Sequence, residues 1–180
     1  AVHPTLNHTS ETLANGWLYR LKCRGEDGVF RPVNRIDKNT SGLVLCAQNA
    51  FAAPELAKTA QKCYLALVEG PLPVGSGRID VPIARRGDSI IGRCVREDGK
   101  PSVTEYTVLA GDSLYGGHTD IIARHALHCA VLRFNRPADH EPRRVQSPLP
   151  EDFLAACCAA HLPDKEEIQT MLQSVLPCAE

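Results

Sequence analysis

Asp37 lies in a polar turn between two apolar stretches, and its type and surroundings make it the strongest candidate for chemistry. The stretch Asn34-Arg35-Ile36-Asp37-Lys38-Asn39-Thr40-Ser41-Gly42 places one carboxylate between two cations. A positioned carboxylate can stabilise positive charge, attack an electrophilic carbon or accept a proton. It can equally well cap a turn by bonding its own backbone, with Arg35 and Lys38 as solvated charges. The spacing alone leaves both interpretations open.

The apolar stretches on either side of this turn predict the elements that hold it. Residues 32–36 read as a short strand and residues 43–47 as a buried one. Leu13, Trp17, Leu18 and Leu21 recur at helical spacing, so we expect a short amphipathic helix capped by Thr9 or Ser10. A second helix is expected over 50–61, with Pro54 in its first turn, where a missing N–H is tolerated.

The rest of the chain alternates strand and turn signals and ends in helices. Strands are expected over 62–70, 78–83, 90–95, 99–109 and 124–130. Arg85 and Arg86 fall between two of these strands, either at a solvated hairpin tip or in contact with a phosphate. One or two helices are expected over 154–180, and the last of them begins near Pro163 and packs on the sheet.

The segment around Asp37 resembles the catalytic motif of the RluA-type pseudouridine synthase family, written His-Arg-Leu-Asp-x-x-Thr-Ser-Gly-Leu. Asn34 stands in place of the histidine and Ile36 in place of the leucine. Four further motifs of this family follow in the same order. They are found at Lys62 to Gly70, Gly99 to Leu109, Arg124 to Ala130 and Pro148 to Phe153. The resemblance runs from His3 to Phe153, and such an ordered set is far more specific than any single motif.

The resemblance implies an α+β fold, a mixed and largely antiparallel sheet with flanking helices, as a single catalytic domain over 1–180. It implies an isomerase that converts specific uridines in rRNA or tRNA to pseudouridine with an aspartate and no cofactor. Asp37 matches the catalytic aspartate. Tyr64 matches the tyrosine that stacks on the target base and has been proposed as a general base. The expected RNA-binding residues are Arg35, Asn34, Thr40, Lys62 and Lys100.

The resemblance breaks between Ala110 and Gly111. In the family this point carries a segment with the motif Thr-Gly-Arg-x-His-Gln-Ile-Arg-x-His, whose final arginine pairs with the catalytic aspartate, and here that segment is missing. An arginine within ion-pair reach of Asp37 would therefore support catalysis. A solvent-facing Asp37 without a cationic partner would favour the alternative, an inactive remnant of the family with residual RNA binding.

The composition limits the binding partners and the cellular compartment that we expect. The net charge is −1, yet residues 20–104 carry +5 and residues 105–180 carry −5, which fits one face presented to an anionic polymer. Eight cysteines without a Cys-x-x-Cys pair favour free buried thiols and a reducing, cytoplasmic setting. No apolar run is long enough to span a membrane.

Two further expectations concern metals and the limits of the chain. We expect no metal at His118, His125 and His128, because no carboxylate completes a tetrahedral set with them. Ala1-Val2-His3-Pro4 is typical of the middle of an element, so we interpret the chain as a fragment that an S4-like domain could precede. Nothing in the sequence requires more than a monomer.

Overall fold

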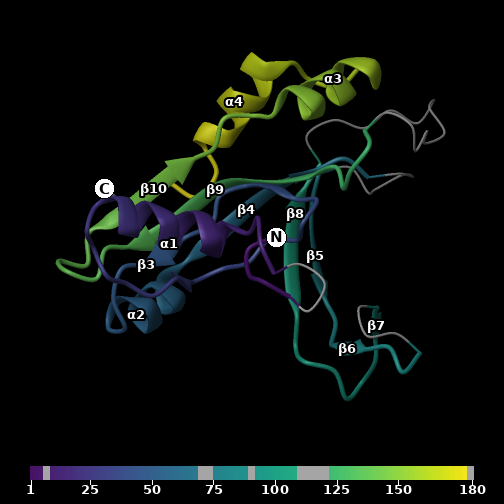
Figure 1. Cartoon of the computed structure of the whole chain (residues 1–180). Helices are drawn as coiled ribbons and strands as arrows, with labels where there is room; N and C mark the ends of the chain where they lie inside the picture. Colours follow the sequence, from purple (N-terminus) through teal and green to yellow (C-terminus); the bar gives the residue numbers. More distant parts are fainter. Residues whose placement is uncertain (6–8, 69–74, 89–91, 109–121, 178–180) are drawn as a thin grey trace. The chain divides into compact units, whose positions relative to one another are not determined.

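A computed structural model describes residues 1–5, 9–68, 75–88, 92–108 and 122–177 of the chain (Figure 1). The chain divides into two compact units. The first unit comprises Ala1–Val68 and His118–Glu180, and the second comprises Glu69–Gly117. Each unit is described by itself. The predicted break near residues 110–111 lies outside the described residues, and the single-domain assignment stays a prediction.

The described residues form four helices and ten strands. The helices are α1 (Leu13–Cys23), α2 (Ala52–Thr59), α3 (Glu151–Ala159) and α4 (Lys165–Gln173). The strands are β1 (Arg31–Pro32), β2 (Ser41–Gly42), β3 (Cys46–Ala47), β4 (Gln61–Ala66), β5 (Ser76–Asp80), β6 (Ile83–Arg85), β7 (Arg93–Val95), β8 (Val103–Thr107), β9 (Leu127–Asn135) and β10 (Pro142–Gln146). This mixture confirms the α+β class.

Strand β9 is the centre of the first unit, because three other strands pair with it. Strand β4 runs antiparallel along one edge of β9. Strand β10, antiparallel, and β2, parallel, share the opposite edge. A strand can pair with one neighbour on each of its two edges. Residues of β9 that pair with β4 also pair with β10 or β2, so β4 must lie on the edge opposite to both. Beyond the strand ends, the Leu67 N–H still donates to the Ala126 carbonyl at 2.9 Å.

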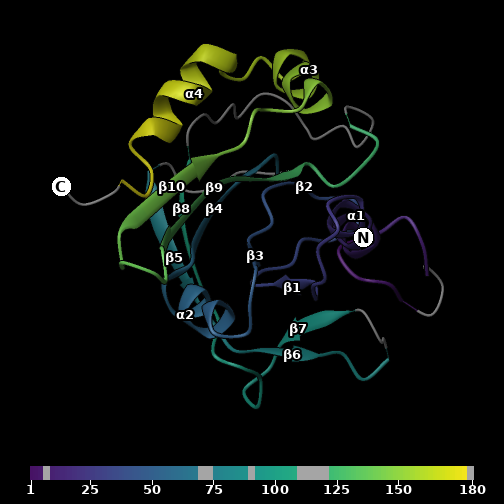
Figure 2. The same ribbon diagram turned by 60° about the vertical axis from the view of Figure 1, so that its left-hand side comes forward.

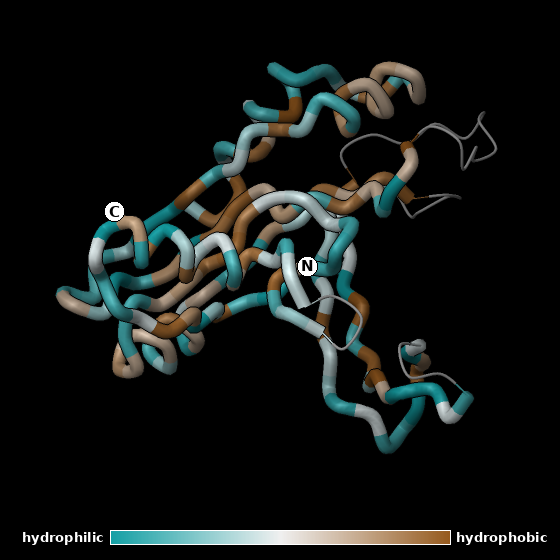
Figure 3. The backbone as a smooth tube through the Cα atoms, viewed as in Figure 1, coloured by the Kyte–Doolittle hydropathy of each residue, from teal (hydrophilic) through white to brown (hydrophobic). Residues whose placement is uncertain are grey.

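The main core lies between this sheet and the last two helices, which lie together on one side of it (Figure 2). Val131 and Leu65 pack with Phe153 of α3, and with Ile168 and Leu172 of α4. Hydrophobic colouring runs along β9 in Figure 3. The predicted packing of the C-terminal helix on its own sheet is confirmed. Asp164 caps α4 by accepting from the Glu167 N–H at 2.9 Å.

A smaller core lies under the stretch that carries Asp37. Val2, Ala14 and Phe30 are buried there, and Ile36 and Val44 pack against them. Trp17 also joins this cluster, with its ring centroid 6.2 Å from that of Phe30. Helix α1 therefore supports the candidate catalytic stretch.

Several predicted boundaries were wrong. Thr12, rather than Thr9 or Ser10, caps α1, because its hydroxyl accepts from the Asn15 N–H while the Asn15 side chain accepts from the Thr12 N–H. The two strands expected over 32–36 and 43–47 shrink to β1 and β3, and a loop closed by Asn34 takes the residues between them. Strand β9 continues to Asn135, well beyond Ala130.

The second unit is built on one long antiparallel ladder. Strand β5 pairs with β8, and the same register continues through the Val81 N–H to the Ser102 carbonyl and on to an isolated bridge between Ile83 and Lys100. Strand β7 then pairs with β6 (Figure 2). The strand expected over 78–83 is therefore split between β5 and β6. Among the described residues, no helix is long and apolar enough to cross a membrane.

Candidate active site

The Asp37 stretch is a loop that leaves one short strand pair and returns to it. Strands β1 and β3 pair antiparallel, with Pro32 opposite Cys46, and the Val33 N–H donates to the Leu45 carbonyl at 2.7 Å. The chain between Val33 and Leu45 is thus closed at its base like a hairpin loop. Its tip carries Asp37.

Asn34 closes this loop from inside. Its side chain is 7% exposed. The Nδ2 group donates to the Leu43 carbonyl at 3.2 Å, and Oδ1 accepts from the Leu45 N–H at 2.7 Å. A buried amide that satisfies two backbone groups holds both ends of the loop in one register. Asn34 is therefore a structural clamp for the loop, and its predicted contact with RNA stays a prediction.

Asp37 stands at the start of a tight turn and is exposed. The Thr40 N–H donates to the Asp37 carbonyl oxygen at 3.0 Å, which closes a four-residue turn. Asp37, Thr40 and Ser41 line an open pocket of about 390 Å³, together with apolar side chains that include Ile36 and Val44. The candidate catalytic carboxylate thus borders a pocket that a base could enter.

Thr40 reaches the same pocket with an unused hydroxyl. Its side chain is 7% exposed, and its Oγ1 has no hydrogen-bond partner among the described residues. Buried hydroxyl groups are normally bonded, so this oxygen is a candidate for a substrate contact. The predicted RNA contact of Thr40 stays a prediction with this observation in its favour.

A bulge in β9 places Tyr64. The register of β4 against β9 shifts between Cys63, opposite Val131, and Tyr64, opposite Cys129, so that Ala130 is the extra residue. Bulges re-aim side chains and are common beside active sites. Here Tyr64 lies opposite Cys129, and the side chains of Cys129 and Asn34 are near enough to the Tyr64 hydroxyl to influence its pKa.

The pKa of Tyr64 is raised to about 12, first by burial of the ring and then by the neighbouring Cys129 and the negative charge of Asp37. Only about one phenol in 10⁵ would be ionised at pH 7 with such a pKa. Tyr64 in this state is a hydrogen-bond donor and a flat apolar surface. Asp37 contributes to this shift, but Tyr64 is not among the residues that line the pocket beside Asp37.

Strand β2 anchors the loop to the central strand. Ser41 and Gly42 pair in parallel with His128 and Cys129, and the Leu43 N–H donates to the Cys129 carbonyl at 3.0 Å. Gly42 has φ +107°, and a Cβ added there would lie 2.6 Å from the Cys129 amide nitrogen. Only glycine permits this conformation and this close approach.

Ser41 and His128 strengthen the same junction. Ser41 Oγ lies 2.9 Å from Nδ1 of His128. The His128 side chain is 1% exposed, and its pKa is lowered by burial and by the Arg124 charge. His128 is therefore a neutral, structural histidine. No group of three or more potential metal ligands occurs in the described part of the chain, and His118 lies outside it.

Arg124 ties the loop to helix α3. Its guanidinium donates to both carboxylate oxygens of Asp152, at 2.6 and 2.8 Å, and also to the Asn39 carbonyl at 3.4 Å. The arginine lowers the pKa of the Asp152 carboxyl. A bidentate pair of this kind fixes geometry as well as adding energy. Arg124 was part of a recognised motif, but nothing in the sequence indicated its contact with the Asp37 loop.

The remaining predicted residues are exposed. Arg35 lies on the Asp37 loop, Lys62 on β4, and Lys100 in the second unit. Each can reach solvent, as an RNA contact requires, and each assignment stays a prediction.

Asp37 forms no ion pair within the described residues of its unit. The arginine expected beside a catalytic aspartate is therefore not supplied there by another residue. The sequence-based argument for that arginine assumed a buried carboxylate. Asp37 is exposed, so the described residues show the arrangement that, in the sequence analysis, favours the alternative of an inactive remnant, although an exposed carboxylate needs a cationic partner less than a buried one does.

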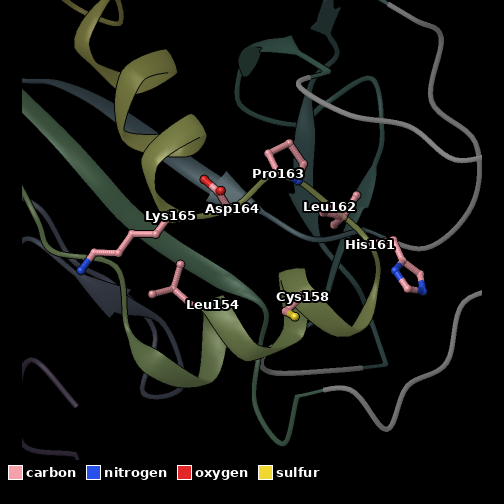
Figure 4. Close-up of a pocket in the computed structure, with 7 residues that line it drawn as sticks. All are labelled: Leu154, Cys158, His161, Leu162, Pro163, Asp164 and Lys165. Carbon is pink, nitrogen blue, oxygen red and sulfur yellow. The ribbon is translucent and has the colours of Figure 1, made fainter.

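A larger pocket, of about 510 Å³, lies between α3 and α4 (Figure 4). Leu154 and Cys158 border it from α3, and Asp164 and Lys165 border it from the start of α4. It contains no residue of the Asp37 loop and no predicted site residue. We therefore assign the candidate active site to the smaller pocket.

The motif loop, the tyrosine and the sheet that holds them define a known class of protein. The family model described as RNA pseudouridylate synthase matches residues 2–146, and the chain belongs to this family.

Individual relatives agree. Two proteins of Bacillus subtilis, described as the uncharacterized RNA pseudouridine synthases YjbO and YlyB, are 32% and 34% identical. The alignments cover 83% and 84% of this chain but 66% and 64% of the relatives. The ribosomal large subunit pseudouridine synthase D of Xanthomonas campestris is 31% identical, over 84% of this chain and 61% of that protein. The matched stretch thus spans less than two thirds of each of these relatives.

A solved structure has the same fold. The human RNA pseudouridylate synthase domain containing 1 superposes with a TM-score of 0.63 at 23% identity, covering 94% of this chain and 87% of that one. At this identity the likeness supports the fold alone.

Proposed function

We propose that this chain isomerises uridine to pseudouridine in RNA, with Asp37 as the catalytic carboxylate and without a cofactor. The observation that carries the proposal is the position of Asp37, at the tip of a clamped loop beside an open pocket and within electrostatic reach of Tyr64. The family membership supports the reaction class.

The reaction needs no second substrate. The N1–C1′ bond of the nucleotide breaks, the uracil turns, C5 bonds to C1′, and the C5 proton is exchanged for one on N1. Base and sugar stay bound throughout, so proximity lowers the barrier. The Asp37 carboxylate can stabilise the positive charge that develops at C1′, bond to that carbon, or accept a proton from C2′.

Tyr64 serves the flipped base in this proposal. A target nucleotide must leave the RNA stack, which costs a few kcal/mol and needs a surface to receive the base. The half-buried ring of Tyr64 offers that surface. Its raised pKa, of about 12, argues for a neutral phenol and against a general base near neutral pH. Arg35 on the same loop would contact the RNA that the uridine leaves.

The substrate class is structured rRNA or tRNA. One curated relative is named for the large ribosomal subunit, which makes rRNA the first substrate to test. The expected partner is RNA, in a cytoplasmic setting, with the protein as a monomer.

Tritium release from RNA labelled at uridine C5 tests the proposal. The protein is compared with Asp37→Asn and Asp37→Ala on rRNA and tRNA transcripts. Asparagine keeps the ability to hold a turn and removes only the charge. Release by the unchanged chain and none by either variant supports the proposal. Equal release by all three proteins refutes the assignment of Asp37. If the folded chain binds RNA without releasing tritium, the inactive-remnant alternative takes its place.

A further inference from the structure

The hydroxyl of Thr40 is a buried polar group of the candidate active site that the described fold does not use. The Thr40 side chain is 7% exposed and borders the pocket beside Asp37. Its Oγ1 atom is buried and has no hydrogen-bond partner among the described residues. A hydroxyl that is buried without a partner costs free energy, which a valine of similar shape would avoid. The packing therefore gives no reason for a hydroxyl here, whereas a ligand in the pocket would.

The backbone of Thr40 is held on both sides. Its N–H donates to the Asp37 carbonyl at 3.0 Å. The next residue, Ser41, belongs to β2 and pairs with His128 of β9 (Figure 2). The loop thus sets the position of the Thr40 Cβ. Rotation about the Cα–Cβ bond moves the hydroxyl between staggered positions, and an unpaired hydroxyl loses no hydrogen bond when it turns toward the pocket.

Ser41 also borders this pocket, but its hydroxyl is engaged. The Ser41 Oγ atom lies 2.9 Å from Nδ1 of His128, whose side chain is 1% exposed. A ligand that used the Ser41 hydroxyl would have to compete with a buried histidine. Thr40 has no such competitor among the described residues, so its hydroxyl can contact a substrate without breaking a hydrogen bond of the fold.

We propose that Thr40 forms a hydrogen bond with the 2′-hydroxyl of the target uridine and thereby selects ribose over deoxyribose. This rests on the proposed function, in which Asp37 acts at C1′ or C2′ of the sugar. The 2′-oxygen is bonded to C2′, and Thr40 borders the same pocket as the Asp37 carboxylate. A 2′-hydroxyl can both donate and accept a hydrogen bond, as the threonine hydroxyl can.

The course of the reaction favours a contact with the sugar over one with the base. The uracil must turn before C5 can bond to C1′, whereas the sugar stays attached to the RNA backbone. A short side chain on a held loop can therefore keep its hydrogen bond to the sugar throughout the reaction. A hydrogen bond from Thr40 to the uracil would have to break when the base turns.

Three variants of the full chain test the proposal. Thr40→Val removes the hydroxyl and keeps the branched shape, and Thr40→Ser keeps the hydroxyl. Thr59→Val is the matched control, because the fold uses the Thr59 hydroxyl. That hydroxyl accepts from the Asn135 N–H at 3.1 Å and donates to the Glu55 carbonyl at 3.4 Å. Thr59 is the last residue of α2 and does not border the Asp37 pocket.

Urea unfolding measures the first expected difference. Thr40→Val should leave the unfolding midpoint unchanged or raise it, since no hydrogen bond of the fold is lost. Thr59→Val should lower the midpoint, because the Asn135 N–H loses its acceptor. If Thr40→Val lowers the midpoint as much as Thr59→Val does, the Thr40 hydroxyl is bonded within the fold, and the proposal is overturned.

RNA binding measures the selectivity itself. The probe is a labelled stem-loop with a single loop uridine, made with either ribose or 2′-deoxyribose at that nucleotide alone. The unchanged chain should bind the ribose form about twofold to tenfold more tightly, as expected from a single hydrogen bond. Thr40→Val should lose this preference, whereas Thr40→Ser and Thr59→Val should keep it. The proposal is overturned if the unchanged chain shows no preference, or if Thr40→Val retains it in full.

Selectivity and catalysis are read separately in this design. If the unchanged chain releases no tritium but its preference for ribose depends on Thr40, the proposed function fails and the ribose contact of Thr40 stands. If tritium release depends on Asp37 while Thr40→Val prefers ribose as strongly as the unchanged chain does, the proposed function stands and the ribose contact fails.

Discussion

Replacing Gly42 with alanine should detach strand β2 from the central strand. Gly42 has φ +107°, and the new Cβ would lie 2.6 Å from the Cys129 nitrogen and 2.7 Å from its carbonyl carbon. Backbone conformations of this kind cost a side-chain-bearing residue about 1–3 kcal/mol. Moving β2 away also loses the bond from the Leu43 N–H to the Cys129 carbonyl, worth about 1 kcal/mol. The expected loss of unfolding free energy is about 2–4 kcal/mol.

Gly25 provides a matched control for this substitution. It also has a positive φ, of +68°, but nothing lies within 4 Å of the Cβ that alanine would add. Gly25→Ala should therefore cost about 1–2 kcal/mol from the backbone alone. The difference between the two variants isolates the collision with β9.

Urea unfolding followed by circular dichroism measures this difference. With a slope of about 2 kcal/mol per molar urea, Gly42→Ala should lower the midpoint by about 1–2 M and Gly25→Ala by at most about 1 M. Tritium release should fall in Gly42→Ala, because the Asp37 loop loses its anchor, and persist in Gly25→Ala. Equal midpoint shifts in the two variants would refute the close approach of β2 to β9.

Three further outcomes follow from the site. Asn34→Ala leaves two backbone groups of the loop without partners, so urea unfolding should show a loss of about 2–4 kcal/mol, and a loss below 1 kcal/mol would contradict the clamp. Tyr64→Phe should remove a tyrosinate step near pH 12 from the absorbance titration and reduce tritium release less than Asp37→Asn does; an unchanged titration would disprove the raised pKa. The depressed pKa of Asp152 means that the Arg124–Asp152 pair stabilises the fold above the usual aspartate pKa, near 3.8, and is lost as pH falls. Arg124→Gln should therefore reduce the loss of unfolding free energy that occurs as the pH falls. If the variant and the unchanged chain lose unfolding free energy in parallel, the Arg124–Asp152 pair is not the cause of that loss.

Short-range sequence patterns correctly predicted the helices whose formation depends on residues close together in the chain. Pro54 lies in the first turn of α2, and the apolar stripe through Ile168 and Leu172 packs on the sheet. The cap of α1 was misplaced because Thr9, Ser10 and Thr12 are all suitable caps, and only the partner Asn15 distinguishes Thr12.

The features that position the site depend on residues far apart in the chain. The parallel pairing of Ser41 with His128 has no periodicity that a single segment could reveal. The bulge at Ala130 interrupts no pattern of apolar residues, because its neighbours in β9 are buried on both faces. Asn34 was predicted to bind RNA as part of the stretch that resembles the family motif. Its burial follows from two backbone groups nine and eleven positions away.

The insertion of the second unit has a consequence for how this family can change length. The unit is inserted between β4 and β9, which are direct neighbours in the sheet, and the Leu67 N–H bonds the Ala126 carbonyl where the two strands diverge. Everything between these two residues is thus, in topological terms, one enlarged hairpin turn. Residues can be added to or removed from such a turn without shifting the register of the strands that it joins. The predicted absence of a family segment near residue 110 would therefore be compatible with an intact sheet, and grafting a segment into this turn would be expected to leave the register of β4 and β9 unchanged.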